Sequence, residues 1–504
     1  MTAADVKTAA DDALTPLGTL FDRLADEGPD LPAIVYGSST WTRRELNNRA
    51  NRLAHHLMAI GVGLGDLVTI GLPNSPEFFE AVLAAWKIGA IPQPVSHRLP
   101  VAELSALVEA ANPKVVIGLD LDVGSRQTLP PGFNPRPDVP ADPPPPAIAP
   151  SWKALASGGS SGRPKLIVAA TRGTAEVLAA MAWPFRVTGD VPLLCTGPLY
   201  HNGPFMVSMA ALSLGAPVVL MPRFDASETL RLVEEHRVGW LYLVPTMMVR
   251  ILRLPDEQRL GRDMSSLRTA YHLGAPCPAH VKRAWIDWLG PDAVMELYGG
   301  TEGAAATTIS GGEWLAHPGS VGKVAFGEMR VLDPTGAELP ANEAGEIFMR
   351  SFNGRPTYRY IGATARTRDG WESLGDIGWF DADGYLYIAD RASDMVLVGG
   401  ANVYPAEIEG ALLEHPSILS ACVVGVPDDE YGNVVHAIVE TKEPVSDQAL
   451  RDHLVPRLVS YKQPRAFVRS DKPLRDDAGK MRRNAIRAAH LERLGAVDRS
   501  ALSG

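Results

Sequence analysis

The segment that decides the fold runs from Ser157 to Lys165 and has the sequence SGGSSGRPK, between the apolar segments 152–156 and 166–168. Its glycines let the backbone turn tightly and present N–H groups to phosphate oxygens, while the hydroxyls and the lysine add further donors. The pattern predicts a loop that binds a triphosphate. The candidate residues are Ser157, Gly158, Gly159, Ser160, Ser161, Gly162 and Lys165.

The spacing of this loop differs from the P-loop pattern GxxxxGK[ST], because Arg163 and Pro164 separate Gly162 from Lys165. A P-loop NTPase or kinase is therefore not expected. Taken alone, the segment has an alternative interpretation as a flexible loop of glycine and serine that binds nothing.

Helical and strand-like patterns alternate along the chain on both sides of this loop. Thr42 and Glu45 have the spacing of a capping box, and apolar residues behind them recur at steps of three and four until Gly61. Further strand-like runs and helical stretches lie at 67–70, 77–87, 115–117, 218–220, 227–235 and 241–244. The alternation predicts an α/β fold with parallel strands.

Length and composition limit the class of protein. The chain has 504 residues, 46% hydrophobic and 21% charged, which fits a globular body with at least one further domain. The formal net charge of -10 gives no reason to expect nucleic acid as a partner. The three cysteines are far apart, and neither a targeting signal nor a membrane span is visible. We therefore expect a cytoplasmic protein.

Two segments depart from this average composition. Residues 130–150 contain ten prolines, too many for a helix or a central strand. A surface loop within one domain is favoured over a linker, because the α/β pattern resumes soon afterwards. Residues 457–493 contain eleven Lys or Arg against four Asp or Glu, which predicts a small C-terminal domain with a basic face.

Four short motifs downstream carry residues suited to nucleotide chemistry: YGGTE at 298–302, ESLGD at 372–376, DRASD at 390–394 and PLRDDAGK at 473–480. A carboxylate such as Glu302 is the hard oxygen ligand that magnesium needs, and the two oxygens of Asp376 suit a vicinal diol. Lys480 offers a mobile cation that can bridge a carboxylate and a phosphate. Individually, these residues have plainer interpretations as a turn glutamate, a turn aspartate and part of the basic face.

Together with the loop at 157–165, and in this order, the motifs resemble those of the acyl-adenylate-forming superfamily of acyl-CoA synthetases, amino-acid adenylation domains and luciferases. The resemblance covers about Thr42 to Lys480. It implies a large N-terminal domain of layered α/β subdomains plus a small β-barrel, residues 1–390, and a small mobile α+β C-terminal domain, residues 391–504. This sequence departs from the family pattern at Gly158, Leu166 and Leu374.

The resemblance also implies a role for each motif. ATP or AMP is expected to contact the phosphate loop together with Gly274, Ala275, Pro276, Tyr298, Thr301, Asp376 and Arg391. Glu302 is the expected Mg²⁺ ligand and Ser393 the expected hinge. Lys480 is the expected catalytic lysine, with His201, Thr301 and Glu302 as further catalytic residues.

The acyl pocket implied by the resemblance is lined by Tyr200, His201, Phe205, Tyr242, Leu273, Gly299 and Gly300, with Tyr271 and His272 as further walls. His201 has an alternative as a hydrogen-bonded core residue. Residues 205–207 supply no aspartate to pair with an ammonium group, which argues against amino-acid substrates. Because two glycines would leave side-chain volume empty, we hypothesise a large apolar acid of the terpenoid or steroid type. A simple tight turn is the alternative.

Gly399 and Gly400 begin the stretch GGANVYPAEIE, which resembles the CoA-binding segment of CoA-forming members. The expected function is an AMP-forming carboxylic acid–CoA ligase that uses ATP, Mg²⁺ and CoA, and a homodimer is compatible with it. One alternative is an acyl-AMP ligase that loads an acyl carrier protein, although no insertion is visible between Gly345 and Asp390. The other is a non-catalytic, nucleotide-binding descendant of such enzymes.

Overall fold

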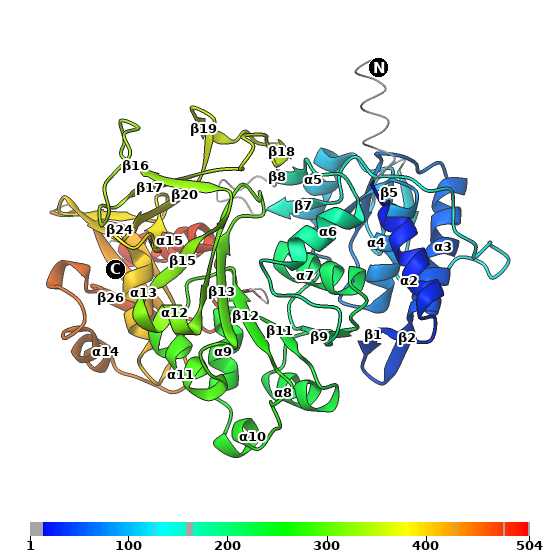
Figure 1. The fold of residues 1–504 in the computed structure, drawn as a ribbon. Coiled ribbons are helices and arrows are strands. Elements are labelled where there is room, and N and C mark those ends of the chain that lie inside the picture. Colours follow the sequence, from blue (N-terminus) through cyan, green and yellow to red (C-terminus); the bar gives the residue numbers. More distant parts are fainter. Residues whose placement is uncertain (1–13, 125, 158–164, 429, 477–478, 502–504) are drawn as a thin grey trace.

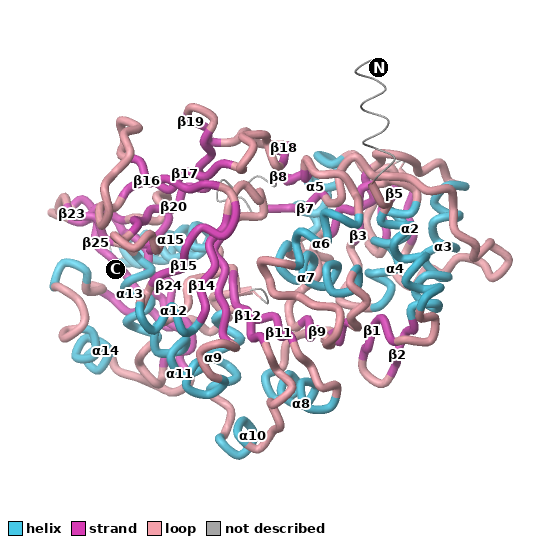
Figure 2. Tube along the Cα trace, viewed as in Figure 1, coloured by secondary structure: helices cyan, strands magenta, loops and turns pink. Residues whose placement is uncertain are grey.

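The computed structural model describes residues 14–501 apart from 125, 158–164, 429 and 477–478. One large mixed sheet crosses the molecule, with the earliest segments of the chain at one end and the C-terminal segments at the other (Figures 1 and 2). The expected α/β fold is confirmed.

Seven strands form the first half of this sheet. In spatial order they are β2 (Ser39–Thr42), β1 (Pro32–Tyr36), β10 (Val218–Leu220), β9 (Leu193–Cys195), β11 (Trp240–Leu243), β12 (Thr269–Leu273) and β13 (Val294–Gly299). Apart from the β1–β2 pair, neighbouring strands are parallel. The strands expected at 218–220 and 241–244 lie here, the second displaced by one residue.

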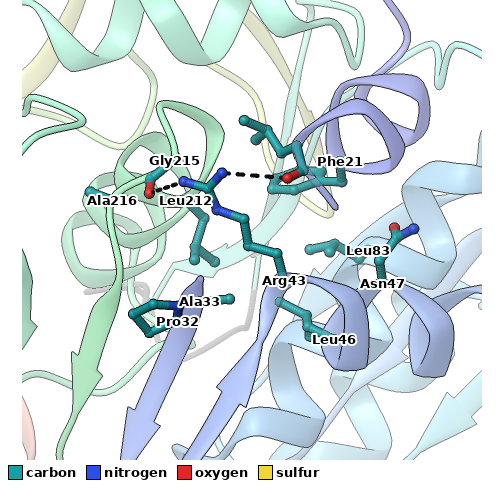
Figure 3. A pocket seen from close by; sticks show the side chains of 11 residues that line it. Phe21, Pro32, Ala33, Arg43, Leu46, Asn47, Leu83, Leu212, Gly215 and Ala216 are labelled. Atoms are coloured by element: carbon teal, nitrogen blue, oxygen red, sulfur yellow. Dashed lines mark hydrogen bonds between the residues drawn. The ribbon is translucent and has the colours of Figure 1, made fainter. Parts of the chain in front are cut away.

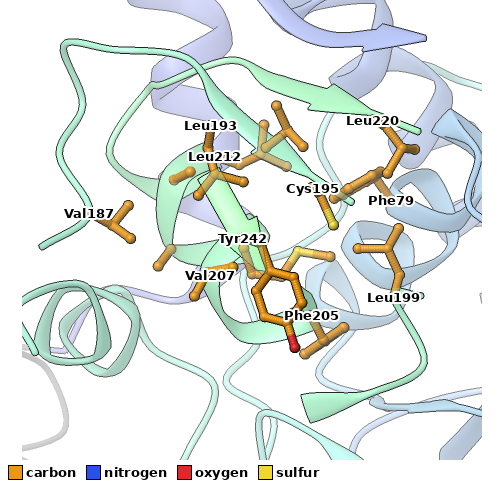
Figure 4. Close-up of a cluster of buried hydrophobic side chains, with 14 of the residues drawn as sticks. Phe79, Val187, Leu193, Cys195, Leu199, Phe205, Val207, Leu212, Leu220 and Tyr242 are labelled. Carbon is orange, nitrogen blue, oxygen red and sulfur yellow. The ribbon is translucent and has the colours of Figure 1, made fainter. Parts of the chain in front are cut away.

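Helices cover this parallel half, as buried parallel strands require. They are α6 (Ala175–Ala182), α7 (Asn202–Ser213), α8 (Ala226–Glu235), α9 (Pro245–Leu252), α10 (Asp256–Leu260) and α11 (Ala279–Leu289). Figure 4 shows the centre of the resulting core, where Tyr242 of β11 lies among apolar side chains of β9, β10 and α7. The α/β layering therefore buries the strands that lead into the expected site.

The second half of the sheet is antiparallel, and its described strands form an open order rather than the closed small barrel that the resemblance implies. Its strands are β14 (Ala306–Ser310), β15 (Ser320–Phe326), β21 (Leu386–Arg391), β20 (Trp371–Phe380), β17 (Gly345–Arg350), β16 (Glu328–Leu332) and β19 (Arg366–Arg368), with helix α12 (Gly311–Ala316). The β13–β14 pair joins the two halves. At Gly322, with φ +102°, a Cβ would lie 2.0 Å from the carbonyl oxygen of Thr308, so the strand crossing requires glycine.

A second parallel sheet lies beside the first and has the order β4 (Ile91–Pro94), β3 (Leu67–Ile70), β5 (Val115–Ile117) and β6 (Gln127–Leu129). Its neighbouring helices are α2 (Leu17–Glu27), α3 (Arg43–Ala59), α4 (Pro76–Lys87) and α5 (Val101–Ala111). The capping box expected before α3 is confirmed: the Glu45 N–H donates to the Thr42 hydroxyl at 3.2 Å, and the Thr42 N–H donates to the Glu45 carboxylate at 2.8 Å.

A third sheet consists of β18 (Tyr358–Ile361), β8 (Lys165–Ala169) and β7 (Ala154–Ser157), and its last two strands flank the predicted phosphate loop. β7 and β8 are antiparallel, and Ser157 is paired with Lys165, so the two ends of the loop lie side by side. The loop residues between them, 158–164, lie outside the described residues. The proline-rich residues 130–150 form neither helix nor strand and connect β6 to β7, as expected.

The C-terminal segment has its own apolar core, which includes Val403, Ile408, Val423, Val439 and Leu450. It consists of a β-hairpin of β22 (Val396–Val398) and β23 (Ala401–Val403) and a sheet of β24 (Ile418–Asp428), β25 (Gly432–Thr441) and β26 (Ala466–Arg469). Its helices are α13 (Pro405–Leu413), α14 (Asp447–Leu454), the 3-10 turn η1 (Ser460–Lys462) and α15 (Arg483–Ala501). Within the described part of the chain, no helix is both long and apolar enough to cross a membrane.

Candidate active site

The predicted site residues follow the carboxyl ends of neighbouring parallel strands. His201 follows β9, Gly274 follows β12, and Glu302 follows β13. Ligands of open α/β sheets bind at this edge, because the loops after the strands meet there. Figure 1 shows that the C-terminal segment lies beside the antiparallel half of the sheet.

The predicted ribose residues form a compact hydrogen-bonded group. Pairing of β20 with β21 places Asp376 opposite Arg391, and the Arg391 Nε lies 3.3 Å from Oδ1 of Asp376. The Tyr298 hydroxyl donates to the other carboxylate oxygen at 2.7 Å. Burial, followed by the Asp376 charge, raises the pKa of Tyr298 well above its usual value, so this hydroxyl remains a donor. The group presents a nearly buried, oriented carboxylate of the kind that accepts hydrogen bonds from a diol.

Glu302 is buried and held by partners that the motifs did not reveal. Its Oε1 accepts a 2.6 Å hydrogen bond from the hydroxyl of Tyr360, and its backbone oxygen accepts one from Thr357 at 2.7 Å. Lys165 donates to the same Tyr360 hydroxyl at 3.0 Å and lies 3.7 Å from Oε1. The predicted phosphate-loop lysine and the predicted metal ligand are therefore connected through one tyrosine. Thr301 precedes Glu302 in the same turn and is half-buried.

The loop that carries Lys480 reaches the large sheet from the C-terminal segment. Gly479, at φ +74°, packs so closely that a Cβ would lie 2.9 Å from the Thr246 hydroxyl. Lys480 keeps an exposed surface, but surrounding protein lowers the pKa of its ammonium, and the charges of Asp476, Arg391 and Glu302, in decreasing order, also act on this pKa. The structure thus brings Lys480 to the predicted nucleotide residues. Arg482 forms an ion pair with Glu103 of α5 at 2.9 Å. This is a second contact between the C-terminal segment and the rest of the molecule.

His201 is close enough to this lysine for the lysine charge to act on its pKa. It immediately precedes α7, and its ring lies 4.6 Å from the ring of Tyr200. Burial lowers the pKa of His201 to about 3, with the positive charge of Lys480 as the second cause. The imidazole is therefore neutral at physiological pH.

The predicted pocket residues Tyr242 and Leu273 lie close together, whereas Phe205 lies in the core. A Cβ on Gly203 would be 2.9 Å from the Tyr242 hydroxyl and 3.0 Å from Cδ1 of Leu273, so these two side chains meet at the start of α7. Phe205 is fully buried instead, and its ring packs against the rings of Phe78, Trp86 and Trp152. Phe205 therefore belongs to the aromatic core behind the site.

Strand alternation separates the other two suggested walls. Tyr271 is paired with Tyr242 and shares its face of the sheet, whereas His272 is paired with Glu296 on the opposite face. There Glu296 forms a buried ion pair with Lys282, and burial lowers the pKa of His272 to about 4. His272 therefore lies behind the sheet, away from the Tyr242 side.

The two glycines after Tyr298 do not leave empty space, unlike the expectation from sequence. A Cβ on Gly300 would lie 2.6 Å from Leu374 and 2.8 Å from Oε2 of Glu302. A Cβ on Gly299 would lie 3.0 Å from Cβ of Ala306. At both positions other groups approach the backbone closely, so neither the empty volume nor a tight turn through both glycines describes this segment.

The predicted hinge residue and the predicted CoA-binding glycines follow Arg391 in the chain. Ser393 is in an exposed turn, where its hydroxyl donates to Asp394 at 3.2 Å. Gly399 and Gly400 connect β22 to β23, both at positive φ, and the Gly399 N–H donates to the Tyr431 carbonyl at 2.9 Å. The structure does not bring these two glycines into contact with the nucleotide residues described above.

A separate small cavity lies between α2, α3 and the turn after α7 that contains Gly215 and Ala216 (Figure 3). It is lined by apolar side chains and by Arg43, which donates to the carbonyl of Gly215 at 2.7 Å. Its interior of about 20 Å³ is close to the room of one water molecule. It is therefore too small to be the acyl pocket.

Comparison with known proteins agrees with this geometry. The sequence matches the family model described as AMP-binding enzyme over residues 21–358, and the AMP-binding enzyme C-terminal domain over residues 407–480. It is 32% identical over 492 residues to a feruloyl-CoA synthase from an Amycolatopsis species, which covers 94% of this chain and 98% of that protein. It is 30% identical to a fatty acid–[acyl-carrier-protein] ligase from Streptomyces coeruleorubidus, and the match covers 92% of this chain and 94% of that protein.

Solved structures show the same similarity. The o-succinylbenzoate CoA synthetase from Bacillus subtilis, in complex with its acyl-adenylate intermediate, superimposes with a TM-score of 0.81 at 27% identity, over 93% of this chain and 97% of that chain. The same enzyme with ATP and magnesium gives a TM-score of 0.80 at 27% identity, over 92% and 98%. Since the first family model spans more than half of the sequence, this chain belongs to the AMP-binding enzyme family.

Proposed function

We propose that this chain is an AMP-forming carboxylic acid–CoA ligase that uses ATP, Mg²⁺ and CoA. The observation that carries the proposal is the position of Lys480. This residue comes from the C-terminal segment, yet its pKa responds to Glu302 and Arg391, and its charge lowers the pKa of His201. A cation near both the nucleotide residues and the acyl side is what acyl adenylation requires.

In the first half-reaction, a carboxylate oxygen of the acid attacks the α-phosphorus of ATP, and the bond from that phosphorus to the bridging oxygen breaks. Acyl-AMP and pyrophosphate are the products. Residues 157–165 would hold the departing pyrophosphate, and Asp376 with Arg391 would fix the ribose. Lys480 would stabilise the charge that develops at the α-phosphate.

Glu302 fits the requirement for a magnesium ligand. Its carboxylate is buried, and the hydrogen bond from Tyr360 engages Oε1 and orients the group, so that Oε2 is available to a hard cation. When bound, Mg²⁺ would neutralise phosphate charge.

In the second half-reaction, the CoA thiolate attacks the acyl carbonyl carbon, and the bond to AMP breaks. We assign this step to a rotated arrangement of two domains, residues 1–390 and 391–504, with Ser393 as the pivot. Rotation would withdraw Lys480 and bring the Gly399–Gly400 turn towards the acyl group. The charges of Arg391 and Glu302 act on Lys480 in this structure, whereas Gly399 bonds Tyr431 instead, and this difference supports the exchange.

The acid is proposed to be hydrophobic. Tyr242 and Leu273 meet near the gate residues, and the absence of an acidic partner at 205–207 is unfavourable for an ammonium group. The relatives include the feruloyl-CoA synthase, the 2-succinylbenzoate–CoA ligase of Bacillus licheniformis, at 29% identity, and the fatty acid–[acyl-carrier-protein] ligase, so an aromatic acid and a fatty acid are both candidates. The close contacts at Gly299 and Gly300 remove the sequence argument for an unusually deep pocket, so a polycyclic acid remains one member of the test panel.

A carrier protein is the second candidate acceptor, because one relative is a fatty acid–[acyl-carrier-protein] ligase. Acid-dependent exchange of labelled pyrophosphate into ATP tests adenylation, with ferulate, palmitate and a polycyclic terpenoid acid as the panel. Thioester formation is then measured separately with CoA and with a phosphopantetheinyl carrier protein. No exchange with any acid, although ATP binds, would favour the non-catalytic alternative. Light scattering on the same sample distinguishes a monomer from a homodimer.

A further inference from the structure

Lys153 is a buried cation that the mechanism above does not use. It immediately precedes β7, the strand that leads into the phosphate loop, and its residue surface is 5% exposed. Its ammonium donates a hydrogen bond to Oδ1 of Asn202, the first residue of α7, and lies 4.4 Å from the centroid of the Trp152 ring. An uncompensated ammonium in such a position is unfavourable, so its presence calls for a physical reason.

Lys153 is one of three lysines that act on the single carboxylate of Glu302. Lys165 lies 3.7 Å from that carboxylate, and the Glu302 charge acts on the pKa of both Lys153 and Lys480. With Arg391 and the carboxylates of Asp376 and Asp476 counted as well, four cations and three carboxylates leave an excess of one positive charge when all are ionised. A cleft with such an excess attracts anions, and a magnesium–ATP complex and a carboxylate are both anionic.

The hydrogen-bonding capacity of Lys153 is not filled by the protein that the structure describes. An ammonium has three donors. Among the described residues, Asn202 accepts one hydrogen bond, and the face of Trp152 covers another side through a cation–π contact. At least one donor has no acceptor among the contacts that the described residues provide.

We propose that Lys153 binds an anionic oxygen of a substrate in the active site, either a phosphate oxygen of ATP or a carboxylate oxygen of the acid. The inference rests on the proposed ligase function. Its support is the position of Lys153 between two landmarks: Asn202 adjoins the gate residue His201, and Glu302 is the predicted metal ligand. Unlike Lys480, Lys153 is fixed on the body of the enzyme and would remain in place when the C-terminal domain rotates.

The charge of this residue depends on ligand binding. Burial lowers the pKa of Lys153 to about 7, and the Glu302 carboxylate opposes this effect. Among the described residues, Glu302 is the charged group identified as acting on Lys153, while Asn202 and Trp152 contribute neutral contacts. A bound anion favours the charged form and raises its pKa. Binding above pH 7 should therefore take up a proton, and ligand affinity should fall as the pH rises through 7 to 8.5.

A plainer explanation is that Lys153 only ties β7 to α7 through Asn202. Three variants separate the two. Lys153→Met removes the charge at similar length, Lys153→Arg keeps the charge, and Asn202→Ala removes the tie but keeps the lysine. If the tie is the whole role, Asn202→Ala should reproduce Lys153→Met. If Lys153 binds an anion, Asn202→Ala should retain most of the affinity at pH 6.5, where the lysine is charged.

The test is isothermal titration of each full-length variant with magnesium–ATP, and with ferulate in the presence of a non-hydrolysable ATP analogue, in two buffers of different ionisation enthalpy between pH 6.5 and 8.5. We expect Lys153→Met to weaken one ligand roughly 10- to 100-fold, the size of a hydrogen bond to a charged group. We also expect Lys153→Met to abolish the proton uptake that accompanies ligand binding above pH 7. Lys153→Arg should restore part of the affinity. Loss of ATP affinity identifies phosphate as the bound group, and loss of acid affinity identifies the carboxylate.

Equal affinities and equal proton uptake in Lys153→Met and the unmodified enzyme would overturn the inference. So would an Asn202→Ala variant that loses as much affinity as Lys153→Met at pH 6.5. If the unmodified enzyme binds no ATP at all, the proposed function fails instead. Thermal unfolding of each variant shows whether it is folded, and the charge-retaining arginine variant keeps the comparison informative if Lys153→Met is unstable.

Discussion

The hydroxyl of Tyr360 donates a 2.6 Å hydrogen bond to Oε1 of Glu302 and accepts one from Lys165 at 3.0 Å. The tyrosine comes from β18, whereas the glutamate follows β13 and the lysine begins β8. The pairing of β18 with β8 therefore fixes the metal-ligand candidate against the end of the phosphate loop. Because Tyr360 positions both groups, we expect its hydroxyl to contribute to the binding of magnesium–ATP.

Tyr360→Phe removes this hydroxyl and keeps the ring. We expect the KM for magnesium–ATP to rise roughly 10-fold, because a hydrogen bond to a charged group contributes about 1.5 kcal/mol or more. The measurement is pyrophosphate exchange at varied ATP and fixed free Mg²⁺. Tyr387→Phe is the matched control, since its hydroxyl bonds Asp381 at 3.3 Å in the antiparallel region. An unchanged KM in Tyr360→Phe would contradict the positioning role.

Asp376→Asn replaces a two-oxygen acceptor by an amide with one acceptor oxygen. If this residue receives the ribose hydroxyls, ATP affinity should fall roughly 10-fold or more. The sharper measurement compares ATP with 2′-deoxy-ATP and 3′-deoxy-ATP in both proteins. The unmodified enzyme should discriminate against the deoxy ligands, and Asp376→Asn should discriminate much less, since effects at interacting sites are not additive. Equal discrimination in the two proteins would place the ribose elsewhere.

The sequence was sufficient to predict those helices, strands and motifs whose structure depends only on neighbouring residues. The capping box at Thr42 and Glu45 and the strand at 67–70 are set by neighbouring residues, and the structure has both. The order of the nucleotide motifs similarly indicated the family, because each motif is a short stretch of neighbouring residues.

Features that depend on long-range pairing could not be predicted in this way. Tyr360 has no motif, and it reaches Glu302 only because β18 pairs with β8, almost 200 residues earlier in the chain. The argument from Gly299 and Gly300 failed for the same reason, since Leu374 and Ala306 fill the space from other strands. Lys153 did leave a signal, a lysine within an otherwise apolar segment, but its partner Asn202 is in a distant helix.

A histidine pair in the C-terminal segment predicts a pH-dependent stability. His436 Nδ1 lies 2.9 Å from His490 Nε2 of α15, and burial lowers the pKa of both rings. The charges of Arg465 and Arg493 contribute further lowering at His436 and His490, respectively. The folded state therefore favours neutral rings, and its stability falls as the pH drops below the unfolded value of about 6.5.

We expect hydrogen exchange of the α15 amides, corrected for the intrinsic rate, to show less protection at pH 5.5 than at pH 7.5. His490→Gln should reduce this difference, because it removes one of the titrating rings. His236→Gln, at the end of α8, is the control and should leave the α15 difference unchanged. Equal protection at both pH values in the unmodified protein would contradict the prediction.

Lys480→Ala tests whether one site performs two steps in two arrangements. Lys480 lies near the nucleotide residues in this structure, so adenylation should slow by roughly 10²- to 10³-fold, the effect of losing one preorganised charge-stabilising group. Thioester formation from acyl-AMP supplied in advance should change little, because rotation would already have removed the lysine. Lys472→Ala, in the same segment and exposed, is the matched control and should affect neither step. Equal damage to both half-reactions in Lys480→Ala would mean that the lysine stays in the cleft throughout, and the rotation about Ser393 would have to be abandoned.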